Sequence, residues 1–160
     1  LAFLTPAAVL GVGIIETWNR PGTRFLYGGP GILVIGYAAR YLVIGARALA
    51  AVIAQSAVHL EEAAASAGAG FIRRLVQLMV PLHARGILFV WVLVLVFCLR
   101  DLETAVLFYP PGGEPTTVRI FTLEANGPEP VVAALACVHV AVTAVLVMAG
   151  AWLGRRAGAA

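Results

Sequence analysis

Residues 60–82, LEEAAASAGAGFIRRLVQLMVPL, stand apart from the strongly apolar chain on either side of them. The glutamates and alanines at the start are strong helix formers, and carboxylates are favourable in the first turn of a helix. Gly68 and Gly70 then weaken or bend the helix before an amphipathic pattern resumes. Pro81 ends that second stretch or begins the next element. The pattern therefore predicts a helix, a turn and a second helix at a membrane surface.

The composition of the whole chain favours a lipid environment. Of its 160 residues, 61% are hydrophobic and 12% are charged, and the mean hydropathy is +0.95. An ordinary soluble domain is about 45–50% apolar and about 25% charged, so this chain would leave too much apolar surface in water. The net charge of +3 is modest and does not indicate nucleic-acid binding. Cys98 and Cys137 both lie in apolar runs, where we expect buried thiols and no disulfide.

Four hydrophobic stretches are candidate membrane spans, because a helix needs about 20 mostly apolar residues to cross the hydrocarbon core. They cover about residues 1–15, 31–52, 86–109 and 131–153. The predicted fold is therefore all-α, a polytopic transmembrane bundle of about four spans. The first run is short and the chain opens within it, so we expect residues 1–160 to be one transmembrane domain that is truncated at its N-terminus. Residues 109–130 are rich in proline and glycine, and we expect only one short helical turn there.

The arginines are unevenly divided between the two ends of these spans. Six lie near residues 54–84 or after the last span, and three lie on the other side: Arg47, Arg73, Arg74, Arg85, Arg155 and Arg156 against Arg20, Arg24 and Arg119. Because cytoplasmic loops carry an excess of basic residues, we expect residues 54–84 and the C-terminus to be cytoplasmic. Residues 18–30 and 110–130 are then external.

Apart from Arg47, which lies near the end of its span, four charged residues fall inside the predicted spans: Arg40, Arg100, Asp101 and Glu103. Arg40 lies about nine residues into its span, roughly 13 Å deep. Such groups cost at least about 2.5–3.5 kcal/mol each within a bilayer and face a protein interior or a water-filled path. Two interpretations remain open. In the first, Arg40 or Arg100 pairs with Asp101 or Glu103 and locks helices together. In the second, these residues line a translocation path or gate. The two can hold at once.

The segment also carries the fixed positions of a known loop at matching spacing: Glu62, Ala63, Ala64, Gly68, Leu78 and Pro81. The pattern E-A-A, three residues, G, nine residues, I-x-L-P resembles the EAA loop of ABC importer permeases. Leucine and valine stand here where that pattern has isoleucine and leucine. The stretches IETWNRPG and RDLETAVLFYPPGGEPTTVRIFTL are similar to the C-terminal half of ferric-iron-type permeases. We call residues 54–84 the coupling loop.

The resemblance implies a multi-pass permease of a bacterial inner membrane. Its coupling loop would sit in a cleft of a separate, dimeric ATP-binding ABC subunit, with Glu62 offering a charge and the small residues after it allowing close approach. A periplasmic or lipid-anchored solute-binding protein would deliver the solute, and a second permease half or subunit would complete the pathway within the membrane lipid. Ferric iron is the expected solute, although importers of thiamine, phosphonate, polyamines and oxyanions share this architecture. No cofactor is implied.

The residues also limit the other classes of protein. A phosphate-binding loop of the Walker type needs a lysine, and the chain has none, so we expect no enzymatic activity and a separate ATPase. His59 lies three residues before Glu62 without the HExxH pattern or a third ligand, so we predict no metal site. A secondary transporter would also place charges at mid-membrane. A structural membrane subunit is a further alternative for the protein. For the loop alone, the alternative is an ordinary interfacial helix.

Overall fold

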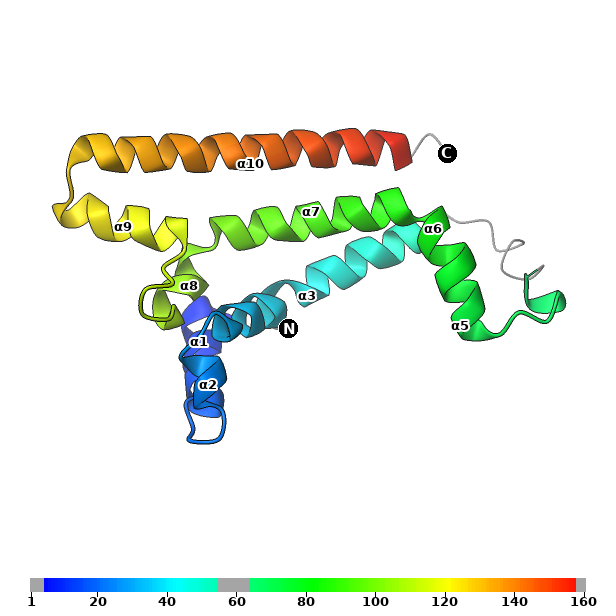
Figure 1. The fold of residues 1–160 in the computed structure, drawn as a ribbon, viewed down its shortest axis with the longest axis horizontal. Coiled ribbons are helices and arrows are strands. Elements are labelled where there is room, and N and C mark those ends of the chain that lie inside the picture. Colours follow the sequence, from blue (N-terminus) through cyan, green and yellow to red (C-terminus); the bar gives the residue numbers. More distant parts are fainter. Residues whose placement is uncertain (1–4, 55–63, 158–160) are drawn as a thin grey trace.

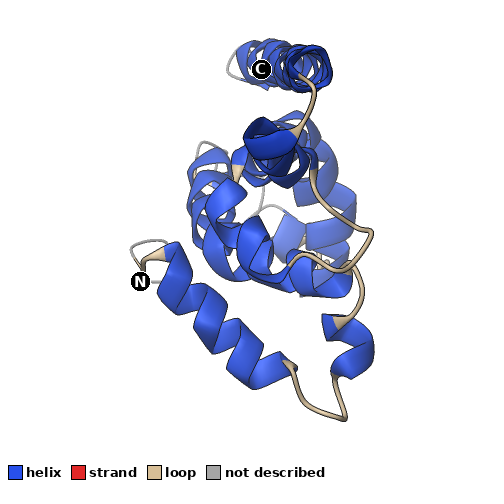
Figure 2. Cartoon of the chain, turned by 90° about the vertical axis from the view of Figure 1, so that its left-hand side faces the viewer, coloured by secondary structure: helices blue, strands red, loops and turns tan. Residues whose placement is uncertain are grey.

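The structure, a computed structural model, describes residues 5–54 and 64–157, and in these two stretches it is all-helical without a strand (Figures 1 and 2). This confirms the predicted fold class. The elements in chain order are α1 (Ala7–Trp18), α2 (Arg24–Tyr27), α3 (Gly31–Ile53), α5 (Phe71–Arg74), the π-helix η2 (Leu75–Met79), α6 (Val80–Leu82), α7 (Ala84–Arg100), α8 (Leu102–Phe108), α9 (Thr116–Asn126) and α10 (Glu129–Ala157).

Three long helices run along the long axis of the molecule, with α7 between α3 and α10 (Figure 1). Among the described residues, α3 and α10 are each long and apolar enough to cross a membrane. A third span is present if α5, η2 and α6, which together form residues Phe71–Leu82, are counted with α7 as one helix pair bent by 75°. The chain is therefore a membrane protein with two or three candidate spans.

The expected count of about four spans is not met. The first predicted span corresponds to α1, which has 12 residues and runs across the long axis (Figures 1 and 2). That length falls short of the roughly 20 residues that a crossing needs. Residues 1–4 of this predicted span lie outside the described residues.

The prediction of one continuous span over residues 86–109 is wrong. α7 ends at Arg100, and α8 begins at Leu102 after Asp101 has adopted an extended backbone with φ −79° and ψ 99°. The Thr104 N–H donates a hydrogen bond of 2.9 Å to Asp101 Oδ1. Asp101 is thus the N-cap of a new helix, and an N-cap residue leaves the helical backbone conformation.

The proline-rich region between α8 and α10 holds more helix than its composition predicts. α9 has 11 residues, not one short turn, and it buries Val118 completely. Pro115 immediately precedes α9, and Gly127 immediately follows it. The helix breakers therefore flank this helix and do not interrupt it.

Glycines allow the three long helices to approach closely. A Cβ built at Gly45 of α3 would lie 3.2 Å from Val94 Cγ2 in α7. On α10, Gly150 and Gly154 are one turn apart and face α7, where a Cβ at Gly154 would lie 3.3 Å from Cδ2 of Phe89. Small residues with this spacing are a common way for helices to pack in lipid, because van der Waals contact replaces the hydrophobic effect there.

The remaining elements gather at the two ends of this row of helices. At one end, α1, α2 and α8 lie near the start of α3, around a small core of Ile14, Ile32 and Phe108, and α9 lies next to α8 (Figure 1). At the other end lie α5, η2 and α6, beside the C-terminal end of α10 (Figure 1). The described part of the coupling loop and the break between α7 and α8 are therefore at opposite ends of α7.

Candidate functional site

Gly68 ends a short helical stretch over residues 64–66 in the coupling loop. Its φ is +78°, in the left-handed region that glycine adopts without strain. The Gly68 N–H donates to the Ala65 carbonyl at 2.9 Å, and the Ala69 N–H donates to the Ala64 carbonyl at 3.1 Å. These two bonds form a Schellman motif, which satisfies the last carbonyls of the helix. The predicted change of direction at Gly68 is confirmed.

A second helical stretch begins after Gly70, whose backbone is extended with ψ 161°. We call this stretch, residues Phe71–Leu82, the elbow helix because it meets α7 at 75°. Its middle widens into the π-helix η2, where the Val80 N–H donates to the Leu75 carbonyl. Pro81 follows within α6, and it has no N–H to offer the Gln77 carbonyl. The coupling loop therefore contains a turn and an angled helix that leads into α7.

The residues predicted to couple to an ATPase are only partly covered by the structure. Glu62 and Ala63 lie outside the described residues, as does His59. Ala64 and Leu78 are partly exposed, whereas Gly68 and Pro81 are exposed. Their proposed role in docking stays a prediction.

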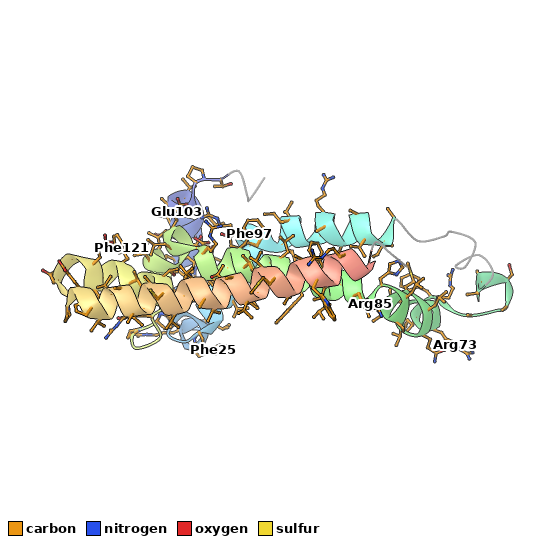
Figure 3. All side chains as sticks on the ribbon, turned by 90° about the horizontal axis from the view of Figure 1, so that it is seen from above. Phe25, Arg73, Arg85, Phe97, Glu103 and Phe121 are labelled. Carbon is orange, nitrogen blue, oxygen red and sulfur yellow. The ribbon has the colours of Figure 1, made fainter. Side chains whose placement is uncertain are left out.

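A cluster of polar side chains lies where α3 passes the break between α7 and α8, and we call it the Arg40 cluster. Arg40 Nη1 donates to Thr104 Oγ1 at 2.8 Å, and Nη2 donates to Glu103 Oε2 at 3.0 Å. Arg40 Nε lies 3.8 Å from Asp101 Oδ2. One guanidinium on α3 therefore joins Asp101, Glu103 and Thr104 at the start of α8, the region in which Figure 3 labels Glu103.

The members of the Arg40 cluster differ greatly in burial. The side chains of Asp101 and Arg40 are 2% and 16% exposed, whereas that of Glu103 is 72% exposed. A buried carboxylate needs both a charge partner and hydrogen bonds. Asp101 receives the charge from Arg40 and a hydrogen bond from the Thr104 backbone. Glu103 is mostly exposed, and exposed ion pairs contribute little to stability.

Aromatic rings border the cluster on the side of α7. The Tyr41 ring stacks on Phe97 with centroids 5.8 Å apart and an interplanar angle of 18°. Arg40 Cζ lies 5.9 Å from the centroid of the Tyr41 ring, within the range of a cation–π contact. The guanidinium therefore has an aromatic neighbour as well as its oxygen acceptors.

Arg100 does not join this cluster. It is exposed, and among the described residues it forms no ion pair and no hydrogen bond through its side chain. Of the two arginines considered as partners for Asp101 and Glu103, Arg40 is the one that pairs. The prediction that these residues line a path or gate stays a prediction.

Sequence reasoning did not include Thr104 or Tyr41 in the site. The run Asp-Leu-Glu-Thr carries a local signal for Thr104, because an aspartate at an N-cap accepts a bond from the backbone two or three residues later. The bond from Arg40 to Thr104 spans 64 positions, and no local pattern indicates it.

Within residues 5–54 and 64–155, no three histidine, cysteine or carboxylate side chains come together. The His83 ring is buried, with Nδ1 2.8 Å from the Met79 carbonyl oxygen. Cys98 and Cys137 are free thiols, but the expectation that both are buried is wrong, since Cys98 is only partly buried and Cys137 is exposed.

The chain matches no known protein family in a comparison with family profiles. Curated proteins and solved structures likewise yield no match. A function for this chain therefore has to be argued from its sequence pattern and from the geometry of its two candidate regions.

Proposed function

We propose that this chain is the transmembrane permease component of a binding-protein-dependent ABC importer in a bacterial inner membrane. The observation that carries the proposal is the coupling loop. The spacing Glu62-Ala63-Ala64, Gly68, Pro81 coincides with a Schellman turn at Gly68 itself and with an angled helix that leads into a candidate span. An ordinary connecting loop needs neither feature.

The proposed mechanism transmits movement along α7. A separate ATPase dimer would hold the helix before Gly68 and draw it inward when ATP binds. The elbow helix is joined to α7 through the single residue His83, so a displacement of the loop acts on one end of α7. α7 has 17 residues and is about 25 Å long. At its other end it is followed by Asp101, the N-cap of α8. The coupling loop and the Arg40 cluster are thus mechanically linked by one helix.

For the solute we propose ferric iron, delivered by a periplasmic or lipid-anchored binding protein to a pathway completed by a second permease half. The support is the similarity of residues 15–22 and 100–123 to ferric-iron-type permeases. Parts of both stretches, in α1, α8 and α9, lie at the end of the molecule away from the elbow helix (Figure 1). Thiamine, phosphonate, polyamines and oxyanions are the alternative solutes.

The test compares two glycines that share a left-handed backbone. Gly68→Val strains the turn by roughly 1–2 kcal/mol, and we expect a five- to thirtyfold loss of association with the ATPase subunit and of ATP-dependent uptake. Glu62→Ala should also reduce association with the ATPase subunit and ATP-dependent uptake. The control is Gly112→Val, because Gly112 has φ +74°, is exposed and lies in the turn between α8 and α9. The measurement is co-purification of the ATPase subunit together with uptake in vesicles.

Two results would contradict the proposal. One is normal ATPase association and uptake in both coupling-loop variants. The other is uptake that proceeds without ATP and without any ATPase subunit, which would favour a secondary transporter.

A further inference from the structure

The elbow helix has large apolar side chains that no other described part of the chain covers. Phe71 is 68% exposed, Ile72 is 75% exposed and Val76 is 58% exposed. No residue of α5 or η2 is buried. A run of exposed aromatic and aliphatic side chains of this density calls for a covering surface.

These side chains fall on one side of the helix. Phe71, Ile72, Leu75 and Val76 follow the i, i+1, i+4, i+5 spacing of a single helical face. Arg73 lies outside this face, and its Nε donates to Gln77 Oε1 at 2.9 Å. The elbow helix therefore has an apolar face, which we call the apolar arc, and a polar face on which an arginine and an amide are joined.

The position of the elbow helix restricts what can cover the apolar arc. The helix crosses the direction of α7 at 75°, and α7 runs beside the candidate span α3 (Figure 1). If α3 crosses the bilayer, the elbow helix lies nearly parallel to the membrane plane at one end of the spans. Because only His83 separates it from α7, the helix cannot move far from that surface.

The charged residues that the structure describes near the elbow helix all have one sign. The sequence contains no aspartate or glutamate between residues 63 and 100. Arg73 and Arg85 are exposed, and both lie at this end of the molecule (Figure 3). Phosphate oxygens are well suited to guanidinium groups, which bind them through two parallel hydrogen bonds. The charge thus complements an anionic lipid surface.

We propose that the elbow helix lies in the headgroup layer of the bilayer, with its apolar arc among the upper acyl chains and with Arg73 and Arg85 on the phosphates of anionic lipids. Interfacial helices bind by this combination of apolar burial and attraction to anionic lipid. The proposal rests on the membrane-spanning helices and does not depend on an ATPase partner. In the coupling loop, lipid would contact the apolar arc, and the residues outside the arc would remain open to an ATPase.

The test uses the full chain reconstituted into vesicles without any ATPase. Starting from a Cys98→Ala, Cys137→Ala background, Ile72→Cys, Val76→Cys and Gln77→Cys are each labelled with a small fluorophore. We expect nitroxide-bearing lipids to quench positions 72 and 76 and aqueous iodide to quench position 77. Val140→Cys on α10 is the control for immersion, because Val140 is 65% exposed on a candidate span.

The contribution of anionic lipid is measured by comparing pure phosphatidylcholine with an equal mixture of phosphatidylcholine and phosphatidylglycerol. Phosphatidylglycerol should increase lipid quenching at position 72. Arg73→Gln and Arg85→Gln should each reduce that increase roughly fivefold at low salt. In phosphatidylcholine the same two variants should behave like the parent chain.

Three results would overturn the proposal. Equal iodide quenching at positions 72, 76 and 77 would show that the apolar arc faces water. Protection of position 72 only after an ATPase subunit is added would show that a protein covers it. Lipid quenching that does not depend on phosphatidylglycerol would show that anionic headgroups do not contribute to binding. None of these results bears on ATPase association, which the Gly68 comparison measures separately.

Discussion

At the scale of single residues, Asp101 has the most demanding position in the described chain. Its side chain is 2% exposed, and its carboxylate caps α8. The negative charge is compensated by Arg40 of α3. Taking away one partner of a buried ion pair leaves an uncompensated charge, which is costlier than losing both. Arg40 and Asp101 should therefore be energetically coupled, whereas the exposed Glu103 should matter little.

The coupling predicts an order of stabilities. Arg40→Met should destabilise the protein most, by about 3–5 kcal/mol, because it leaves the Asp101 carboxylate alone. Adding Asp101→Asn, which keeps an oxygen to cap α8, should restore much of that loss. Glu103→Gln is the control and should cost no more than about 1 kcal/mol. The measurement is thermal unfolding of the detergent-extracted protein, with uptake recorded in parallel.

The uptake data separate the two interpretations of this site. Loss of uptake at unchanged stability in Glu103→Gln would favour a path or gate, and parallel loss of both would favour a lock. If the double variant is no more stable than Arg40→Met alone, Arg40 and Asp101 are not coupled.

At the scale of elements, α10 is held to α7 by surfaces that glycine makes possible. α10 is the longest described helix, with 29 residues, and its spanning stretch is otherwise open to its surroundings. Gly150 and Gly154 bring its backbone against Val92 and Phe89 of α7. Lipid is as apolar as these side chains, so burial from water does not hold the two helices together. Close packing between them has to do so.

This predicts a difference between neighbouring positions on α10. Gly150→Leu or Gly154→Leu should push α10 away from α7 and cost about 1–3 kcal/mol through overpacking. Ala149→Leu adds a similar side chain at an exposed position and should be nearly neutral. The readout is the fraction of folded protein that survives heating in detergent. Equal losses in Gly150→Leu and Ala149→Leu would contradict the packing that we describe.

At the scale of the whole molecule, the row of helices is open. The chain has 10450 Å² of accessible surface, whereas a compact protein of 16.7 kDa exposes roughly 7,600 Å². Large apolar side chains are exposed on α3, α7 and α10, where they suit lipid or further helices. The elbow helix and its arginines lie at one end of the row, and α2 and α9 lie at the other (Figure 1).

This arrangement predicts which positions share a side of the membrane. Single cysteines at Ser66 and Arg155 should both be protected from an impermeant maleimide in intact cells, and a cysteine at Asn126 should be labelled. We expect the side of the first two positions to be cytoplasmic because arginines are in excess there. The background is again Cys98→Ala with Cys137→Ala, and permeabilised cells serve as the control. Labelling of position 66 from outside would reverse the proposed orientation.

Local sequence alone determined the helical class, the bounds of α3 and α10 to within a few residues, and the turn at Gly68. Each of these depends on neighbours along the chain: a run of apolar residues in lipid has to satisfy its backbone within one helix, and a left-handed turn needs glycine at that position. The tertiary structure decided the rest. α1 runs across the molecule, the third span stops at Asp101, and α9 is a full helix between its prolines and glycines. Above all, Arg40 meets Thr104 across 64 positions. Such contacts form only when distant helices are packed side by side, so the choice of Arg40 over Arg100 as the partner of Asp101 could not be predicted from spacing.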